Sequence, residues 1–219
     1  MKFTDVNLLE ELEKPEYAEL KRRFVLRTFP KDALAFSPME GNSRVFVICS
    51  GRARIYLSYA DKEFTLAILG PGDVYSTHTR AGVQALTPLE VLVTDAATFR
   101  RSLAAFPEMT GTIIRVLGGV LSSTFGIISG MVFKDASQRL AEFLLSEAEE
   151  SDEAADAGSA GVLIRPGLTV EQLAQLIGST RQTVSTLLND MIRSKVIERR
   201  ARGEFAILSP RRLREYLEP

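Results

Sequence analysis

Cysteine and histidine are scarce in this 219-residue chain, which contains one of each, Cys49 and His78. A single cysteine excludes a framework of intrachain disulfides and is compatible with a reducing cytoplasm. The two residues also supply too few soft ligands for a structural zinc site. No pairing of a nucleophile with a base, and no constellation of carboxylates, stands out in the rest of the sequence. We therefore expect a cytoplasmic protein that is not an enzyme.

The chain also lacks a large net charge, since it contains 27 Lys and Arg residues and 28 Asp and Glu residues. This balance hides an asymmetry, because residues 161–219 hold ten basic and six acidic residues, a net +4, and the remainder carries −5. A basic C-terminal segment on an acidic body is expected when only one end of a molecule meets a polyanion. The length is sufficient for two small domains of a soluble globular protein.

Residues 107–133 have the pattern of one long helix with two parallel apolar seams. Two adjacent seams indicate two packing partners, which we expect to be the N-terminal body of the chain and the same helix of a second subunit, in a homodimer. Five glycines weaken this helix by ~1 kcal/mol each relative to alanine, which suggests close approach of a twin helix or a flat ligand. The seams are Ile113, Val116, Val120 and Ile127 on one side, and Ile114, Leu117, Leu121, Ile128 and Met131 on the other.

A membrane span is the alternative for this segment, because residues 116–133 contain no charge and are long enough to be a candidate. Serines and glycines interrupt the segment, and Arg115 and Lys134 stand at its ends. No signal peptide precedes it, and both flanks have the pattern of folded soluble domains. We favour a soluble dimer helix with no membrane partner over a membrane-anchored regulator.

The region before the helix predicts a β domain. Residues 1–23 suggest a tail and short helices, and residues 24–94 alternate short apolar runs with turn signals such as Gly70-Pro71-Gly72-Asp73. Strands at this spacing indicate an antiparallel barrel or jelly roll. Residues 95–106 predict a short helix with Asp95 as its N-cap. We assign residues 1–106 to a jelly-roll effector domain and residues 107–134 to a dimerisation helix.

The C-terminal segment predicts a winged helix-turn-helix over residues 135–219, which makes the whole chain α+β. An amphipathic helix is expected at 135–147, an exposed acidic loop at 147–161 and a strand at 162–165. Thr169, with Gln172 three residues later, forms a capping-box signature, and Gly178 ends this helix before Thr180 caps a second one. A hairpin over 196–208 with a basic tip supplies the wing, and Ser209-Pro210 start a last helix. The helix pair should bury Leu173, Ala174, Ile177, Val184, Leu187 and Leu188.

In such a module the second helix enters the major groove of double-stranded DNA, and its first turns meet base edges. Arginine can fork onto guanine and glutamine onto adenine. The alternative is a protein-interaction winged helix whose polar residues are only solvated, which the basic excess disfavours. The residues expected to meet bases are Arg181, Gln182, Ser185, Thr186 and Asn189, and those expected to hold phosphates are Thr169, Arg199 and Arg202.

A jelly roll, a long helix and a winged helix in this order resemble the cyclic-AMP-receptor and FNR superfamily of bacterial transcription factors over essentially the whole chain. The resemblance implies an activator that binds a two-fold symmetric operator as a dimer and acts with RNA polymerase. In cyclic-nucleotide members, a Gly-Glu helix and an Arg-Ser or Arg-Thr pair follow the glycine-aspartate turn. Here Gly72-Asp73 precede VYSTHTRAGVQA, which has neither. An FNR-type iron–sulfur cluster needs several cysteines and is excluded more firmly.

GDVYSTHTRAGVQA and IGSTRQTVSTLLND, with the segment TDVNLLEEL near the N-terminus, are similar to the haem-containing carbon-monoxide sensors of this superfamily. The resemblance implies haem b with His78 as one axial ligand. The other ligand in the family is the N-terminal nitrogen of the partner subunit, for which the Met1 amine is the candidate if the chain starts natively there. Carbon monoxide would displace that amine. Leu117, Gly118 and Leu121 match the helix positions that face the haem.

The sequence departs from that pattern at Ser76, where the best-known member of the family has a cysteine that ligates the oxidised iron. Serine is a poor haem ligand, which speaks against a redox-linked exchange of ligands. Cys49 lies far away in sequence and is expected to be a buried small hydrophobe. The alternative to haem is a regulator of the same superfamily that senses another small effector, with His78 incidental.

Overall fold

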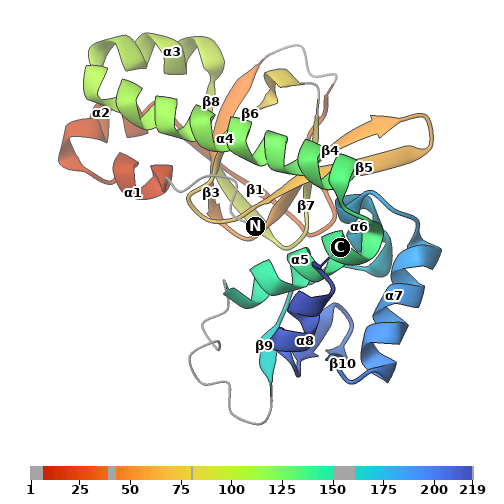
Figure 1. Ribbon diagram of the computed structural model, residues 1–219. Helices are drawn as coiled ribbons and strands as arrows, with labels where there is room; N and C mark the ends of the chain where they lie inside the picture. The colour runs from red at the N-terminus through yellow and green to blue at the C-terminus, as the bar shows by residue number, and fades with distance from the viewer. Residues whose placement is uncertain (1–6, 39–42, 80, 150–160, 219) are drawn as a thin grey trace. The chain divides into compact units, whose positions relative to one another are not determined.

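The computed structural model spans residues 1–219, and the structure describes residues 7–38, 43–79, 81–149 and 161–218. The chain divides into two compact units, one ending at Gly126 and the other beginning at Ile127. The first is mainly β and the second mainly helical, as Figure 1 shows, so the α+β class predicted from the sequence is confirmed.

Two four-stranded antiparallel sheets form the N-terminal unit. One has the strand order β1-β8-β3-β6 and the other the order β2-β7-β4-β5. The turns between consecutive strands fall at the signals seen in the sequence, and Gly51 and Gly72 take positive φ values of 85° and 88° at two turns where the chain passes from one sheet to the other. The strands are β1 Val25–Phe29, β2 Leu34–Phe36, β3 Arg44–Ser50, β4 Ala53–Tyr59, β5 Lys62–Leu69, β6 Val74–Ser76, β7 Gly82–Ala85 and β8 Leu89–Asp95.

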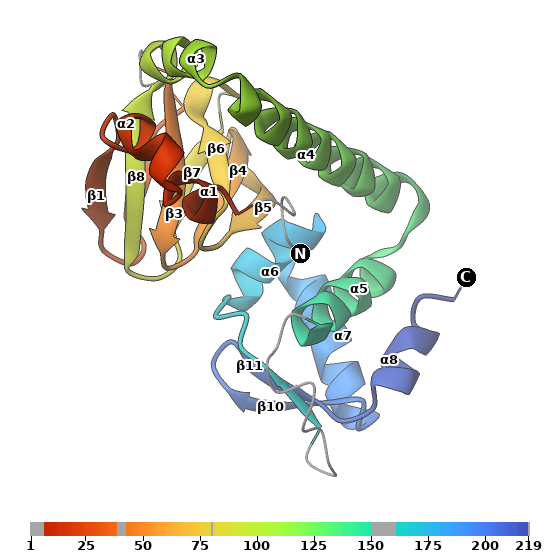
Figure 2. The ribbon, with the colours of Figure 1, turned by 90° about the vertical axis from the view of Figure 1, so that its left-hand side faces the viewer.

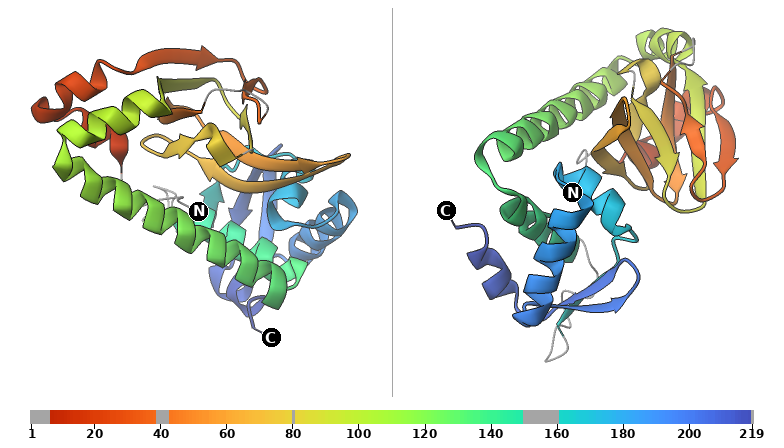
Figure 3. Two further views of the ribbon diagram at one scale, coloured as in Figure 1. Left: turned by 90° about the horizontal axis from the view of Figure 1, so that it is seen from above. Right: turned by 90° about the vertical axis from the view of Figure 1, so that its right-hand side faces the viewer.

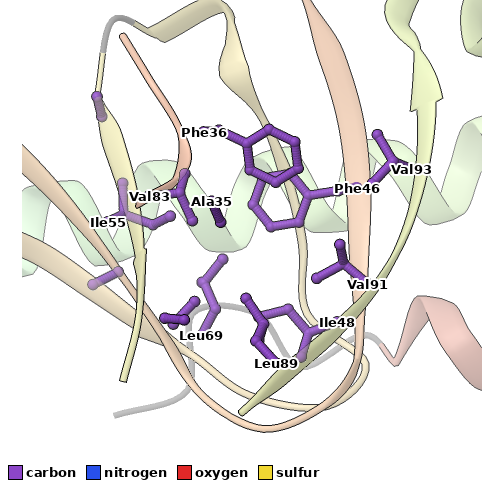
Figure 4. Packing of buried hydrophobic residues seen from close by; sticks show 14 residues of the cluster. Ala35, Phe36, Phe46, Ile48, Ile55, Leu69, Val83, Leu89, Val91 and Val93 are labelled. Atoms are coloured by element: carbon purple, nitrogen blue, oxygen red, sulfur yellow. The ribbon is translucent and has the colours of Figure 1, made fainter. Parts of the chain in front are cut away.

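The core of this unit lies between the two sheets (Figure 4). Side chains alternate across a strand, so Phe46 and Ile48 of β3 point into this core. The ring of Phe46 stacks on Phe36 of the other sheet with centroids 4.7 Å apart. Val45 and Val47 belong to a second cluster, which includes residues of the N-terminal helices α1 (Leu8–Leu12), η1 (Pro15–Tyr17) and α2 (Ala18–Lys21). Figure 2 shows α1 and α2 over that face of the sheet.

Two helices follow the strands. Helix α3 spans Ala96–Ala105, and the predicted N-cap is confirmed because the Asp95 carboxylate accepts a hydrogen bond from the Thr98 amide at 2.8 Å. Hydrogen bonding to Thr98, first to its side chain and then to its amide, lowers the pKa of the Asp95 carboxyl. Helix α4 spans Pro107–Phe133, the range that the sequence predicts, and is continuous in the two views of Figure 3.

The two seams of α4 differ in burial. Val116 is buried and Ile113 and Val120 are half-buried, packed against the clusters of the N-terminal unit, which confirms the intramolecular partner predicted for this seam. The other seam is exposed, with Leu117 at 60% and Leu121 at 54% of their full accessibility. The chain itself therefore covers one seam and leaves the second open to solvent.

Four of the five glycines of α4 do not mark a close approach to another described segment. A Cβ atom added at Gly111, Gly118 or Gly126 would meet no atom of another described segment within 4 Å. At Gly130 it would meet Cδ of Arg139 at 3.8 Å, an ordinary contact. A twin helix or a ligand at Gly118 stays a prediction.

Residues 110–133 of α4 form one helix long and apolar enough to cross a membrane, with a mean hydropathy of 1.8, and 11% of the window is buried. A single helix of this kind is weak evidence for a membrane protein, because an exposed dimerisation helix would pass the same test.

The C-terminal unit contains the predicted winged helix. Its sheet has the strand order β10-β11-β9, and α6 and α7 are joined by Gly178, which takes φ 63° as the left-handed cap of α6. Ser209 caps the last helix, as expected. The elements are α5 Ala136–Glu149, β9 Val162–Ile164, α6 Val170–Ile177, α7 Arg181–Arg193, β10 Ile197–Ala201, β11 Glu204–Ile207 and α8 Pro210–Glu215.

Two details of this unit differ from the sequence-based expectation. The acidic loop was expected from residue 147, yet Glu147 and Ala148 are buried in the last turns of α5, which continues the amphipathic pattern. Most of that expected loop, residues 150–160, lies outside the described residues. Leu187 is half-buried instead of buried, and Met191 fills the core position one turn on, because the buried stripe of α7 runs through Val184, Leu188 and Met191.

Replacing Phe46 by alanine removes one ring of the stacked pair, and we expect it to lower the free energy of unfolding of the N-terminal unit by ~3–5 kcal/mol. Four of the five tyrosines lie in this unit, so urea denaturation followed by tyrosine fluorescence reports on it. Val25→Ala, at a position 65% exposed, is the control. Equal midpoints for the two variants would contradict the assigned core.

Candidate functional site

The N-terminus of α7 is capped and its inner face anchored. Thr180 Oγ1 accepts a hydrogen bond from the Thr183 amide at 3.1 Å, and the two threonine hydroxyls lie 2.8 Å apart. Val184 and Leu188 are buried, as are Leu173 and Ala174 of α6. This packing fixes the orientation of α7, so its opposite face is presented to solvent in one arrangement.

The polar residues predicted to meet bases share that outer face. All five are exposed: Arg181, Gln182, Ser185, Thr186 and Asn189. Thr186 Oγ1 donates to the backbone carbonyl of Gln182 at 3.1 Å, so its hydroxyl proton is engaged within the helix. Arg181 and Gln182 lie in the first turn of α7, and their exposed side chains have donors and, for Gln182, an acceptor to offer to base edges.

Thr169 has a more limited role than the sequence suggested. Its Oγ1 accepts from the Gln172 amide at 3.2 Å, and its own amide donates to Gln172 Oε1 at 2.9 Å, which completes the predicted capping box. The Thr169 amide is therefore unavailable to a phosphate. Its hydroxyl proton remains the one group that Thr169 can offer to DNA.

The wing presents arginines at its turn. Arg202 is exposed beside Gly203, whose φ of 76° the tight reversal requires. Arg199 is exposed, with its guanidinium carbon 5.7 Å from the centre of the Phe205 ring. Stacking on an aromatic face steadies a guanidinium without using its hydrogen-bond donors, which suits contact with a phosphate.

His78 lies in η2 (Thr77–Thr79), a single 3-10 turn directly after β6, and its side chain is exposed. Its Nδ1 lies 2.7 Å from the Ser76 hydroxyl. The residues on either side pin the turn, since Thr77 Oγ1 accepts from the Arg44 amide at 2.9 Å and the hydroxyls of Thr79 and Tyr75 lie 2.6 Å apart. The turn thus holds the imidazole by one nitrogen and leaves Nε2 without a hydrogen-bond partner among the described residues.

This arrangement fits an axial ligand of haem iron. A neutral imidazole binds iron through one nitrogen, and a hydrogen bond at the other nitrogen fixes the tautomer and the ring orientation. The Ser76–His78 contact supplies that second interaction, which the sequence alone did not reveal. No cluster of three or more His, Cys, Asp and Glu side chains that could hold a metal ion occurs among the described residues.

Cys49 is not a suitable alternative ligand for iron. It lies on β3 and is half-buried instead of fully buried as expected, because it sits near the end of the strand. Burial raises the pKa of its thiol, which favours the neutral thiol over the metal-binding thiolate.

The remaining predicted haem contacts are on α4. Leu117, Gly118 and Leu121 lie in its exposed seam, and His78 makes no hydrogen bond to this helix in the described part of the chain. Val120 of α4 and Tyr75 of β6 pack against the same core cluster, so both elements border the interior of the jelly roll. Met1, the predicted second ligand, lies outside the described residues.

A jelly-roll unit, a long helix and a winged helix with an exposed polar reading face together define a transcription regulator with an effector domain. Residues 138–216 match the model of the Crp-like helix-turn-helix domain. Over its full length the chain is 38% identical to a mutant of CooA from Carboxydothermus hydrogenoformans, with 100% of both chains covered and a TM-score of 0.88. The chain belongs to the CRP/FNR family of transcription regulators, whose members bind DNA, usually as dimers acting with RNA polymerase, and are not a class of enzymes.

Two other relatives are named for different effectors. The reduced Fe(II) CO-sensing protein from R. rubrum is 33% identical, with 96% of this chain and 98% of that chain covered and a TM-score of 0.53. The CRP-like cAMP-activated global transcriptional regulator of Mycobacterium tuberculosis is 27% identical over 191 residues, 84% of each chain. Regulators of this family are soluble, which agrees with the preference for a dimer helix over a membrane anchor.

Gln182→Ala should weaken binding to the cognate operator by ~1–3 kcal/mol, the usual discrimination of a good base contact. The loss on unrelated DNA should be smaller. Arg199→Ala is the contrasting variant, because loss of a phosphate contact weakens binding to both DNAs alike and reduces the salt dependence. Fluorescence anisotropy titrations at several salt concentrations measure both. Equal losses on the two DNAs for Gln182→Ala would show that this residue reads no base.

Proposed function

We propose that the protein is a homodimeric, haem-dependent transcription activator that responds to carbon monoxide. The observation that carries this proposal is the geometry of His78, the one histidine of the chain, held through Nδ1 by Ser76 with Nε2 left open. The full-length similarity to a protein named CooA, and to one named for CO sensing, supports the same function.

Haem b would be held by His78 and by the Met1 amine, and when bound it supplies an iron atom that takes up carbon monoxide. In this chain the Ser76 hydroxyl orients the imidazole and selects the nitrogen that is offered. Leu117 and Leu121 of α4 would provide an apolar surface for a macrocycle, and Gly118 between them would allow it to lie near the helix backbone. Ser76 cannot supply a thiolate, so the axial pair is the same in oxidised and reduced protein.

The dimer would form along the exposed seam of α4. Ile114, Leu117, Leu121 and Ile128 present a continuous apolar stripe that the chain does not cover. A second copy of the helix, packed seam against seam, would bury it. Two winged helices would then be presented to a two-fold symmetric operator in the cytoplasm, where RNA polymerase is recruited.

A second candidate is a regulator of the same family that senses another small effector, with no dependence on haem. The similarity to the regulator named as cAMP-activated favours it. Against a cyclic nucleotide, a single 3-10 turn stands between β6 and β7, where cyclic-nucleotide members would carry the longer Gly-Glu helix. Titration of haem-free protein with cyclic AMP, followed by operator binding, separates the two candidates.

His78→Ala should remove the six-coordinate spectrum of the reduced haem protein and the response of operator binding to carbon monoxide. Tyr59→Ala, at an 86% exposed position of the same unit, is the control and should keep both. Absorption spectra of the reduced proteins, with and without carbon monoxide, and analytical ultracentrifugation measure the outcome. The dimer should persist in both variants, because neither residue lies on α4. An unchanged spectrum in His78→Ala would remove the ligand assignment.

Extending the N-terminus tests the second ligand. A protein carrying two additional residues before Met1 displaces the α-amino group, so we expect a five-coordinate or exchanged species at neutral pH in both oxidation states. Protein that begins at Met1 is the reference. Thiolate-type bands in the oxidised reference protein, or the same spectrum in both proteins, would rule out the pair of His78 and the amine.

A further inference from the structure

One arginine of α5 joins two helix ends that are far apart in the sequence. Arg139 Nε donates to the carbonyl of Ile177 at 2.6 Å, and Nη2 donates to that of Gly178 at 3.4 Å. Its Nη1 donates to the carbonyl of Gly130 at 3.3 Å and also to that of Lys134. The first two carbonyls lie at the end of α6. Gly130 lies in the last turn of α4, where its carbonyl also accepts from the Lys134 amide at 3.2 Å, and Lys134 follows the last residue of α4.

The chemistry of this contact is specific to arginine. The last carbonyls of a helix have no partner within it and carry the negative end of the helix dipole. A guanidinium has five N–H donors in a rigid planar fork, so it can serve both helix ends at once. A lysine ammonium carries its three donors on one atom. Arg139 is half-buried, which shields these bonds from water.

The ends of α4 and α6 that Arg139 joins lie in different places of the C-terminal unit. The last turn of α4 belongs to the compact unit that contains the winged helix, since that unit begins at Ile127. Gly178 forms the turn between α6 and α7, and α7 begins three residues later at Arg181. A displacement of the end of α4 can therefore be transmitted to the start of α7 by two routes. One is the Arg139 side chain, and the other is the backbone that connects the two helices.

We infer that Arg139 is a positioning residue that couples the end of α4 to the helix-turn-helix, so that movement of the dimer helix re-aims α7. A simple cap of α6 would need only the carbonyls of Ile177 and Gly178. The bonds to Gly130 and Lys134 serve no purpose in capping α6, and they are what makes the contact a link. This role does not depend on the identity of the effector.

Amide hydrogen exchange of the full-length protein tests the link without any effector. In Arg139→Met we expect exchange to rise several-fold both at residues 131–135 and at residues 178–181. Arg139→Lys should show a smaller rise at the same two places. Arg101→Met is the control, because this arginine of α3 is exposed and, within the described part of the chain, bonds Thr98 of its own helix at 3.1 Å. A rise confined to residues 178–181 would show a local cap and overturn the inference.

The second arm measures operator affinity of the haem-loaded, reduced protein with and without carbon monoxide. We expect the ratio of the two affinities to fall at least several-fold in Arg139→Met, with carbon-monoxide binding unchanged in the absorption spectrum. A ratio equal to that of the wild type would overturn the inference. If carbon monoxide leaves operator binding of the wild type unchanged, the proposed function fails, and the exchange measurement still decides on Arg139. If Arg139→Met does not fold, Arg139→Lys is judged by the same criteria.

Discussion

The architecture depends on a helix that is apolar on more sides than its own chain covers. Helix α4 buries Val116 against the N-terminal unit and leaves Leu117, Leu121 and Ile128 in water. Exposed apolar stripes of this extent are unusual in soluble monomers and normally mark an interface. In the proposed dimer, pairing of two such helices would bury this seam, and any event that alters the seam would act on both subunits together.

Two polar contacts, one in each unit, orient functional groups. In the N-terminal unit the Ser76 hydroxyl lies against the imidazole of His78, and in the C-terminal unit Arg139 donates to carbonyls at the ends of α4 and α6. In both places one polar side chain decides the orientation of another group. This arrangement suits a regulator, since a small change alters a limited number of defined bonds.

Local sequence signals predicted most of the elements, because each rule acts within a few residues. Thr169 with Gln172, Gly178 and Asp95 are caps whose bonds close within three or four residues, and the structure has them as expected. Contacts between distant segments escaped prediction. The bonds of Arg139 to Ile177 and Gly178 span 38 and 39 positions, and no pattern near Arg139 indicates them. The burial of Met191 in place of Leu187 depends on the rotation of α7 about its axis relative to its neighbours. The spacing of apolar residues alone does not determine this rotation.

The uneven distribution of charge has a consequence for the search for an operator. Residues 161–219 carry a net +4, residues 127–160 of the same compact unit carry −6, and residues 1–126 carry +1, for a total of −1. The basic segment with the helix-turn-helix would attract DNA phosphates, whereas the acidic residues of the same unit would be repelled by them. Orientations that bring residues 127–160 to the phosphates would therefore be short-lived. Nearly neutral overall, the protein can thus approach DNA in a preferred orientation without the strong unspecific adhesion of a uniformly basic surface.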